Sequence, residues 1–154
     1  MDRRALLGLA RDAIREAVCQ GRLLDLPDWT GALAELCGAF VTLHRHGRLR
    51  GCIGQITRST PLGETVARCA VSSALQDPRF PPVTPEELKE LEIEISVLSP
   101  LERIQPADIE VGRHGLLISH EGRRGLLLPQ VPVEHRWSRE QFLEETCLKA
   151  GLNA

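Results

Sequence analysis

Two pairs of short apolar segments, each joined by a polar turn, constrain the fold of this chain more than any other feature. The first pair covers residues 39–44 and 49–56, and the second covers residues 115–119 and 125–128. This pattern predicts two β-hairpins. Residues 91–97 add a segment in which apolar and polar side chains alternate, as expected of a strand with one buried face. The sequence therefore predicts mainly antiparallel strand pairing.

Four segments have the periodicity or the end signals of helices. Residues 3–20 place apolar side chains three and four positions apart, which is typical of an amphipathic helix. We expect a second helix to begin at Thr60 and a short third helix to follow Thr84. A fourth is expected between Ser138 and Ala150. Because long β-α-β crossovers are lacking, the sequence predicts an α+β fold with a mainly antiparallel sheet flanked by helices.

The composition argues against several classes of protein. The formal net charge is −2 and aromatic residues make up 3% of the chain, so no nucleic-acid surface is expected. The sequence has no apolar run that could cross a bilayer and no signal-peptide pattern, so no membrane association is expected. The five cysteines include no C-x-x-C pair, which indicates reduced thiols and a cytoplasmic protein. A length of 154 residues predicts a single domain.

The strongest candidate for a functional site is the segment Leu-Arg-Gly-Cys-Ile-Gly at residues 49–54. Gly51 and Gly54 leave room for backbone or a ligand to approach Cys52, because neither glycine carries a Cβ atom. Arg50 supplies positive potential, which favours the thiolate form of the cysteine. The alternative interpretation is structural, because a cysteine in a glycine-containing strand is often a small buried side chain.

Charged residues in separate motifs provide further candidates. If they converge, they form a small cationic pocket for a carboxylate or a phosphate. These cations are Arg50, Arg79, Arg113, His114 and Lys149. Residues 77–82 form a proline-rich link. Phe80 would anchor this link or form the floor of such a pocket, and Asp77 would form a turn or hold Arg79 in place. Glu94 would act as a general base only if it is buried, and otherwise faces solvent or pairs with an arginine.

Two further pairs of residues are of the types that bind metals or form redox pairs. His44 and His46 have a spacing that can hold a metal, but a third ligand would have to come from a distant segment. We therefore expect a solvated turn and no metal site. A redox pair of Cys52 and Cys147 would require the last helix to pack beside residues 49–54.

Several ordered motifs resemble those of the AMMECR domain family, also called AmmeMemoRadiSam system protein A. They lie at residues 38–43, 49–54, 77–83, 93–100, 112–116, 128–131 and 149–152. The resemblance implies a two-lobed α+β domain whose motifs gather along a cleft between the lobes. It also implies an association with a radical-SAM protein and a Memo-type, dioxygenase-like protein, and it identifies no reaction and no cofactor. Family members usually continue beyond the last motif, so residues 1–154 are expected to lack a C-terminal extension.

Two hypotheses about function follow from these residues and from the resemblance. The first is a cytosolic binding or accessory protein that works with radical-SAM and Memo-like partners. In this hypothesis Arg50 and His114 fix a small anionic ligand or a partner's peptide, and Cys52 contacts it. The alternative is an enzyme that uses Cys52 as a nucleophile in acyl or group transfer. The sequence contains no legible catalytic triad, which favours the first hypothesis.

Overall fold

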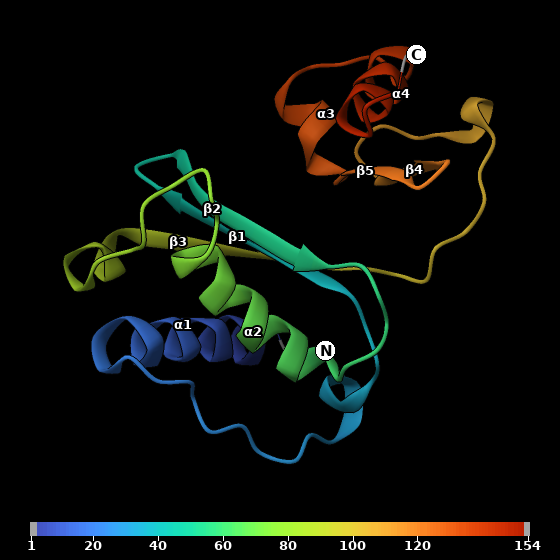
Figure 1. Ribbon diagram of the computed structural model, residues 1–154. Helices are drawn as coiled ribbons and strands as arrows, with labels where there is room; N and C mark the ends of the chain where they lie inside the picture. The colour runs from blue at the N-terminus through green and yellow to red at the C-terminus, as the bar shows by residue number, and fades with distance from the viewer. Residues whose placement is uncertain (1–2, 153–154) are drawn as a thin grey trace. The chain divides into compact units, whose positions relative to one another are not determined.

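The computed structural model describes residues 3–152 (Figure 1). The chain divides into two compact units, the first ending at Pro100 and the second beginning at Leu101. Each unit has its own core and is described here by itself. Among the described residues, no helix is both long enough and apolar enough to cross a membrane.

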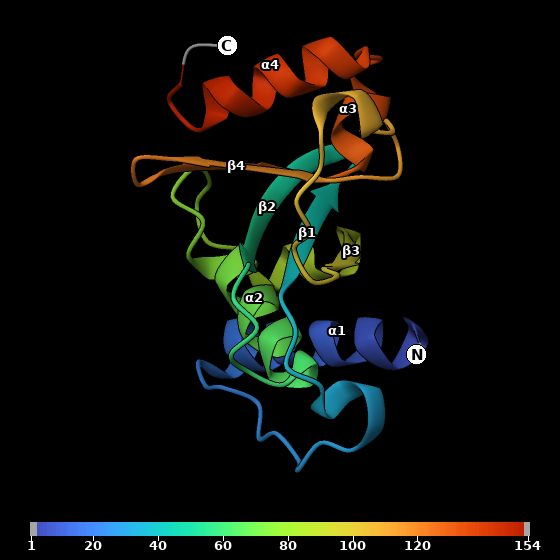
Figure 2. The same ribbon diagram turned by 90° about the vertical axis from the view of Figure 1, so that its right-hand side faces the viewer.

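The first unit is a three-stranded antiparallel sheet covered on one face by two helices (Figures 1 and 2). Its strand order is β2-β1-β3, so the hairpin β1-β2 is completed by β3 on the other side of β1. In chain order its elements are α1 (Arg3–Gln20), the 3₁₀ turn η1 (Gly31–Ala34), β1 (Ala39–Arg45), β2 (Arg48–Gln55), α2 (Leu62–Leu75), the 3₁₀ helix η2 (Pro85–Glu90) and β3 (Leu91–Val97).

The core of the first unit lies between the sheet and the two helices. Ala39, Val41 and Leu43 occupy alternate positions of β1 and are fully buried. Ile14 of α1 and Val66 of α2 belong to the same apolar cluster. The central strand therefore turns one set of side chains toward the helices and the other set toward the opposite face of the sheet.

The second unit is built around the second hairpin. Its elements are the 3₁₀ turn η3 (Pro106–Asp108), β4 (Leu116–His120), β5 (Arg123–Leu127), α3 (Gln130–Glu134) and α4 (Arg139–Lys149). Phe142 of α4 is fully buried in a cluster with Ile109 and Leu116. Ser138 caps α4, because its side chain accepts the backbone N–H of Gln141.

The predicted α+β fold with antiparallel pairing is confirmed, with differences at three places. The second helix begins at Leu62, with Pro61 rather than Thr60 as its cap residue. The segment after Thr84 forms a 3₁₀ helix. The helix α3 was not predicted, because proline breaks longer helices. Pro132 is the third residue of this short helix, where a backbone N–H would have no partner within the helix, so its missing N–H costs no hydrogen bond.

The helix α2 packs directly on the backbone of β2 at Gly51. A Cβ atom built on this glycine would lie 2.1 Å from the carbonyl oxygen of Ser73, which is far inside contact distance. The hydroxyl of Ser73 accepts the N–H of Ile53 at 2.9 Å and lies 2.8 Å from the carbonyl oxygen of Val41. Gly51 is therefore required by the close approach of helix and strand.

We predict that Gly51→Ala lowers the free energy of unfolding by about 3 kcal/mol or prevents folding, because the added methyl group meets backbone that cannot move alone. Gly8→Ala is the matched control, since a Cβ atom there has nothing within 4 Å. In α1 this second change is expected to raise the free energy of unfolding by up to about 1 kcal/mol. Urea denaturation of both variants checks this, and equal stabilities would contradict the packing described.

Candidate functional site

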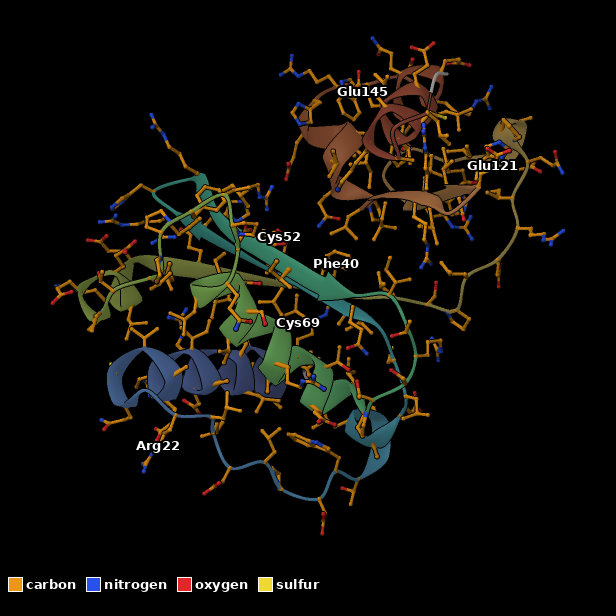
Figure 3. All side chains as sticks on the ribbon, viewed as in Figure 1. Arg22, Phe40, Cys52, Cys69, Glu121 and Glu145 are labelled. Carbon is orange, nitrogen blue, oxygen red and sulfur yellow. The ribbon has the colours of Figure 1, made fainter. Side chains whose placement is uncertain are left out.

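Cys52 lies on the face of the sheet that α1 and α2 leave uncovered (Figure 3). Its partner in the register of β1 is Thr42, which pairs in turn with Glu94 of β3, so the three residues form a row across the sheet. Cys52 is half-buried, and its sulfur lies 3.2 Å from the hydroxyl oxygen of Thr42. This hydroxyl is the sulfur's only hydrogen-bond partner among the described residues.

A buried carboxylate holds the backbone of Cys52 and the side chain of Arg79 together. Asp77 Oδ2 accepts the N–H of Cys52 at 3.0 Å and an Nη2–H of Arg79 at 2.8 Å. Asp77 Oδ1 accepts the backbone N–H and the Nε–H of Arg79 at 3.1 and 3.0 Å. Each carboxylate oxygen of Asp77 thus accepts two hydrogen bonds.

This arrangement fixes the charge state of Asp77. Hydrogen bonds from the Arg79 side chain hold the pKa of Asp77 well below its usual value, although burial acts in the opposite direction. The backbone N–H groups of Cys52 and Arg79 add to the lowering of this pKa. The Asp77 side chain is only 2% exposed, so the ionised group depends on these four donors.

The guanidinium group of Arg79 is held in place yet remains accessible. Its side chain is 56% exposed, and its Nη2 atom lies 3.5 Å from the carbonyl oxygen of Cys52. Its central carbon lies 5.4 Å from the centre of the Phe80 ring, within the range of a cation-π contact. Arg79 is therefore an oriented cation beside the strand that carries Cys52.

Arg50 has a different role from the one expected. Its Nε and Nη2 donate to the two carboxylate oxygens of Glu87 at 2.9 and 3.1 Å, and its side chain is 12% exposed. Hydrogen bonds from Arg50 lower the pKa of Glu87 to about 2 against the effect of burial, and the N–H of Thr84 adds to this lowering. Its charge is therefore engaged by Glu87 rather than directed at the thiol of Cys52.

A β-bulge explains this orientation of Arg50. Gly51 pairs with Leu43, whereas Leu49 pairs with His44, so Arg50 is the extra residue on β2. Regular alternation would put Arg50 and Cys52 on the same face of the sheet, but a bulge interrupts the alternation and redirects a side chain. No sequence signal at residues 48–50 marks this bulge.

The second glycine of the segment accommodates an aromatic ring. A Cβ atom on Gly54 would lie 2.3 Å from the ring of Phe40, its register partner on β1. Cys52 and Phe40 are both labelled in Figure 3. Together with Gly51, this shows that both glycines are needed for internal packing.

Three of the predicted cations belong to the second unit, and each has a local partner there. Arg113 forms an ion pair with Glu110 at 3.1 Å, and Nδ1 of His114 accepts the backbone N–H of the same glutamate at 3.1 Å. Lys149 Nζ donates to the carbonyl oxygen of Leu126 at 2.7 Å. The convergence of the five cations stays a prediction, as does the Cys52–Cys147 pair.

The structure adds residues that the sequence did not single out. Thr42, Phe40 and Glu87 contact the motif from other segments. Phe40 and Thr42 lie in the family motif at residues 38–43, and Glu87 belongs to the capping box that begins at Thr84. His46 lies in the β1-β2 turn with a φ of 53° and its Nε2 lies 3.2 Å from a carboxylate oxygen of Glu90. Within residues 3–152, no group of three or more His, Cys, Asp or Glu residues could hold a metal ion.

Comparison with known proteins identifies the family. The AMMECR1 family profile matches residues 7–154. This chain belongs to the AMMECR1 family. A family member from Thermococcus gammatolerans is 49% identical over 159 residues, which cover 96% of this chain and 78% of that protein. Another from Methanothermobacter thermautotrophicus is 46% identical over 157 residues, covering 97% of this chain and 82% of that protein.

The fold is shared with a solved AMMECR1 relative. The crystal structure of an uncharacterized protein from Pyrococcus horikoshii superposes with a TM-score of 0.91 at 47% sequence identity. The match covers 97% of this chain and 79% of that one. The α+β architecture is therefore that of the AMMECR1 family.

We predict that the chain loses stability in acid because of Asp77 and Glu87. Both pKa values are lowered by folding, so the ionised groups stabilise the fold above about pH 5, and this stabilisation is lost as the pH falls toward 2. Glu87→Gln is expected to lower the free energy of unfolding at pH 7 by about 3 kcal/mol and to flatten its dependence on pH. Urea midpoints between pH 7 and pH 2 measure this.

Glu64→Gln is the matched control for the acid experiment. Glu64 lies on α2, where it forms a more exposed ion pair with Arg68 at 3.7 Å. Such a pair contributes at most about 0.5 kcal/mol, so the control should keep the pH dependence of the unchanged chain. A Glu87→Gln variant with the same acid sensitivity as the control would contradict the prediction.

Proposed function

We propose that this chain is a cytoplasmic AMMECR1-family accessory protein that binds a small anionic ligand, a carboxylate or a phosphate, beside Cys52. The observation that supports this proposal is the guanidinium of Arg79, which Asp77 orients and which remains 56% exposed. An oriented donor group loses less side-chain entropy when it binds a ligand than a free surface arginine does.

The hydrogen-bonding pattern of Arg79 indicates how an anion would bind. Asp77 takes the Nε–H and one Nη2–H, and no hydrogen bond joins Nη1 to any described residue. The two N–H groups of Nη1 are therefore available to a carboxylate or phosphate oxygen. Because Asp77 largely neutralises the charge of the guanidinium, binding would depend on hydrogen-bond geometry more than on long-range attraction.

Residues around this guanidinium would complete the ligand site. Cys52 and Thr42 contribute a thiol and a hydroxyl on the same face of the sheet, and Phe80 contributes a ring beside Arg79. Glu94 ends the row across the sheet and would favour a ligand that also carries a donor group. In this proposal Cys52 contacts the ligand and does not attack it.

The contacts of Cys52 favour binding over nucleophilic catalysis. A cysteine nucleophile usually has an imidazole or another base within hydrogen-bonding distance, oriented by a third group. The sulfur of Cys52 instead contacts a threonine hydroxyl, and the cation that precedes it in sequence, Arg50, is paired with Glu87. These contacts supply no proton acceptor of the required strength.

The partners and the compartment in this proposal come from the family resemblance and from the cysteines. Radical-SAM and Memo-like proteins are the proposed partners. The bound anion would be a metabolite, or a carboxylate or phosphate group of a molecule on which these partners also act. The five cysteines are all free thiols, which supports a reducing compartment such as the cytoplasm.

We predict that Arg79→Lys weakens the binding of inorganic phosphate at least about fivefold, because lysine keeps the charge but lacks the planar fork. Phosphate is titrated into the full chain, and backbone amide shifts of Cys52 and Arg79 are followed by NMR. Arg68→Lys, on the exposed side of α2, is the matched control and should bind as the unchanged chain does. The same pair of variants is then compared for association with purified radical-SAM and Memo-like proteins.

Two results would contradict the proposed ligand site. The first is the absence of any shift at Cys52 and Arg79 with phosphate or acetate at millimolar concentration. The second is equal binding by Arg79→Lys and Arg68→Lys in folded variants.

We predict further that Cys52 reacts with iodoacetamide no faster than Cys19, which is exposed on α1. The half-buried sulfur is shielded and lacks an activating base among its hydrogen-bond partners. Mass-spectrometric labelling of all five cysteines between pH 6 and pH 9 provides the rates. Selective, rapid labelling of Cys52 would instead support the enzyme that uses this residue as a nucleophile.

A further inference from the structure

The two edges of the sheet in the first unit differ in how many of their outward backbone groups are hydrogen-bonded to side chains. The N–H of Leu98 donates to the carbonyl oxygen of Gly38 at 2.9 Å, which fixes the hydrogen-bonded pairs between β3 and β1. Because such pairs alternate along an antiparallel ladder, Glu92, Glu94 and Ser96 are the residues of β3 that bond β1. The backbone groups of the intervening residues, 91, 93, 95 and 97, therefore point away from the sheet.

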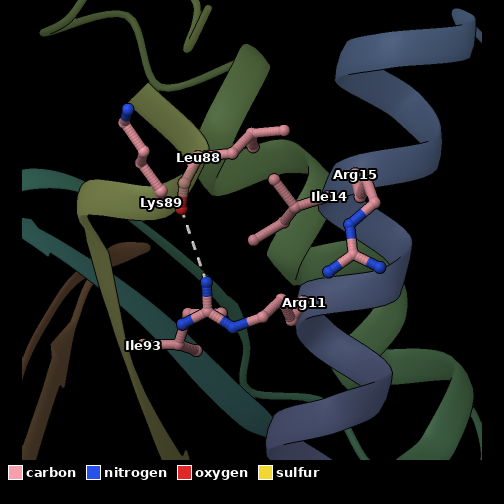
Figure 4. A pocket seen from close by; sticks show the side chains of 6 residues that line it. All are labelled: Arg11, Ile14, Arg15, Leu88, Lys89 and Ile93. Carbon is pink, nitrogen blue, oxygen red and sulfur yellow. Dashed lines mark hydrogen bonds between the residues drawn. The ribbon is translucent and has the colours of Figure 1, made fainter. Parts of the chain in front are cut away.

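One edge of the sheet is closed by side chains. At the outer edge of β2, the N–H of Cys52 donates to Asp77 and its carbonyl oxygen faces Nη2 of Arg79. The start of the β3 edge is closed in a similar way, since Arg11 of α1 donates to the carbonyl oxygen of Leu91 at 3.0 Å. The same guanidinium reaches the carbonyl oxygen of Leu88 at 3.4 Å, as Figure 4 shows.

The remainder of the β3 edge is not closed by any residue that the structure describes. The backbone N–H and C=O groups of Ile93, Ile95 and Val97 face outward and have no hydrogen-bond partner among residues 3–152. Three consecutive outward residues are enough to pair with an added strand over a length of about 17–20 Å. Exposed edge groups of this kind recruit extended peptides.

A hollow of about 720 Å³ runs beside these backbone groups. It is lined by Arg3, Leu6 and Leu7 of α1 and by the β3 residues Ile93, Glu94, Ile95 and Val97. Leu7 and Val97 are 39% and 37% exposed, so part of the apolar lining is open to solvent. Apolar side chains of an added strand would bury this surface.

We propose that the outer edge of β3 binds an extended segment of a partner protein as a fourth strand, and that this segment alternates apolar and basic residues. Its backbone would bond Ile93, Ile95 and Val97, and its apolar side chains would fill the hollow on the side of α1. Its basic side chains would lie on the opposite face of the sheet, beside Glu92 and Glu94.

Charge distinguishes this occupant from a second copy of the chain. In antiparallel registers that pair Ile93 of one copy with Ile93, Ile95 or Val97 of the other, Glu94 lies opposite or diagonal to a glutamate of the second copy. Like charges so placed destabilise strand pairing, whereas lysine or arginine at these positions stabilises it. The backbone groups of this edge are separate from those beside Arg79, which lies at the other edge of the sheet, but Glu94 takes part in both proposals.

Hydrogen exchange of the full chain tests the edge first. The amides of Ile93, Ile95 and Val97 are expected to exchange at least about tenfold faster than those of Glu92, Glu94 and Ser96, which bond β1. Equal protection of both sets in the free chain would mean that the edge is already paired, and would overturn the proposal.

Binding is then measured with a capped seven-residue peptide that alternates lysine and valine, followed through the amide shifts of β3. The same peptide with glutamate in place of lysine should bind at least about tenfold more weakly. Val97→Pro removes an outward N–H without touching the ladder to β1, and is expected to weaken binding at least about fivefold. Val97→Ala is its matched control, because it removes the side chain and keeps the N–H.

Three outcomes would overturn the proposal. The lysine peptide fails to protect the amides of Ile93, Ile95 and Val97. The glutamate peptide, or the folded Val97→Pro variant, binds as well as its control. The free chain forms a dimer that Val97→Pro dissociates, in which case the edge pairs two copies of this chain.

Discussion

The carboxylate of Asp77 is the interaction on which the arrangement of the first unit depends. It follows α2 by two residues and reaches the N–H of Cys52, so it ties the end of the helix to the edge of β2. Asp77 also orients the guanidinium of Arg79. Beyond the proline-rich link, the N–H of Val83 donates to the carbonyl oxygen of Ala74 at 2.9 Å and so holds the end of the link to α2. Without this buried anion, the strand edge, the helix end and the guanidinium would have no common partner.

The motif at residues 49–54 combines packing with a surface that can bind. Gly51 admits the backbone of α2 and Gly54 admits the ring of Phe40, so both glycines are explained inside the first unit. The thiol of Cys52 is left on the opposite face of the sheet with Thr42. The chemistry of this face therefore comes from residues far from one another in sequence, and the proposed anion site depends on Arg79 rather than on Arg50.

Local sequence signals predicted the elements well and the site less well. The two hairpins, the alternation in β3 and the capping boxes at Thr84 and Ser138 follow from patterns within a few residues, and the structure contains them all. The bulge at Arg50 depends on the register between two strands, and its ion pair with Glu87 depends on how η2 packs. Such tertiary contacts leave no local pattern, which is why the partner of Arg50 was not predicted.

The closed edge at β2 has a consequence for how this sheet can be enlarged. Because an aspartate and an arginine stand where a neighbouring strand would be, hydrogen-bonded growth on that side would first require their ion pair to move. Any lengthening of the sheet, by a natural partner or by a designed fusion, is thus directed to one side only. A protein engineer could add a strand at the far side and leave the thiol-bearing surface unaltered.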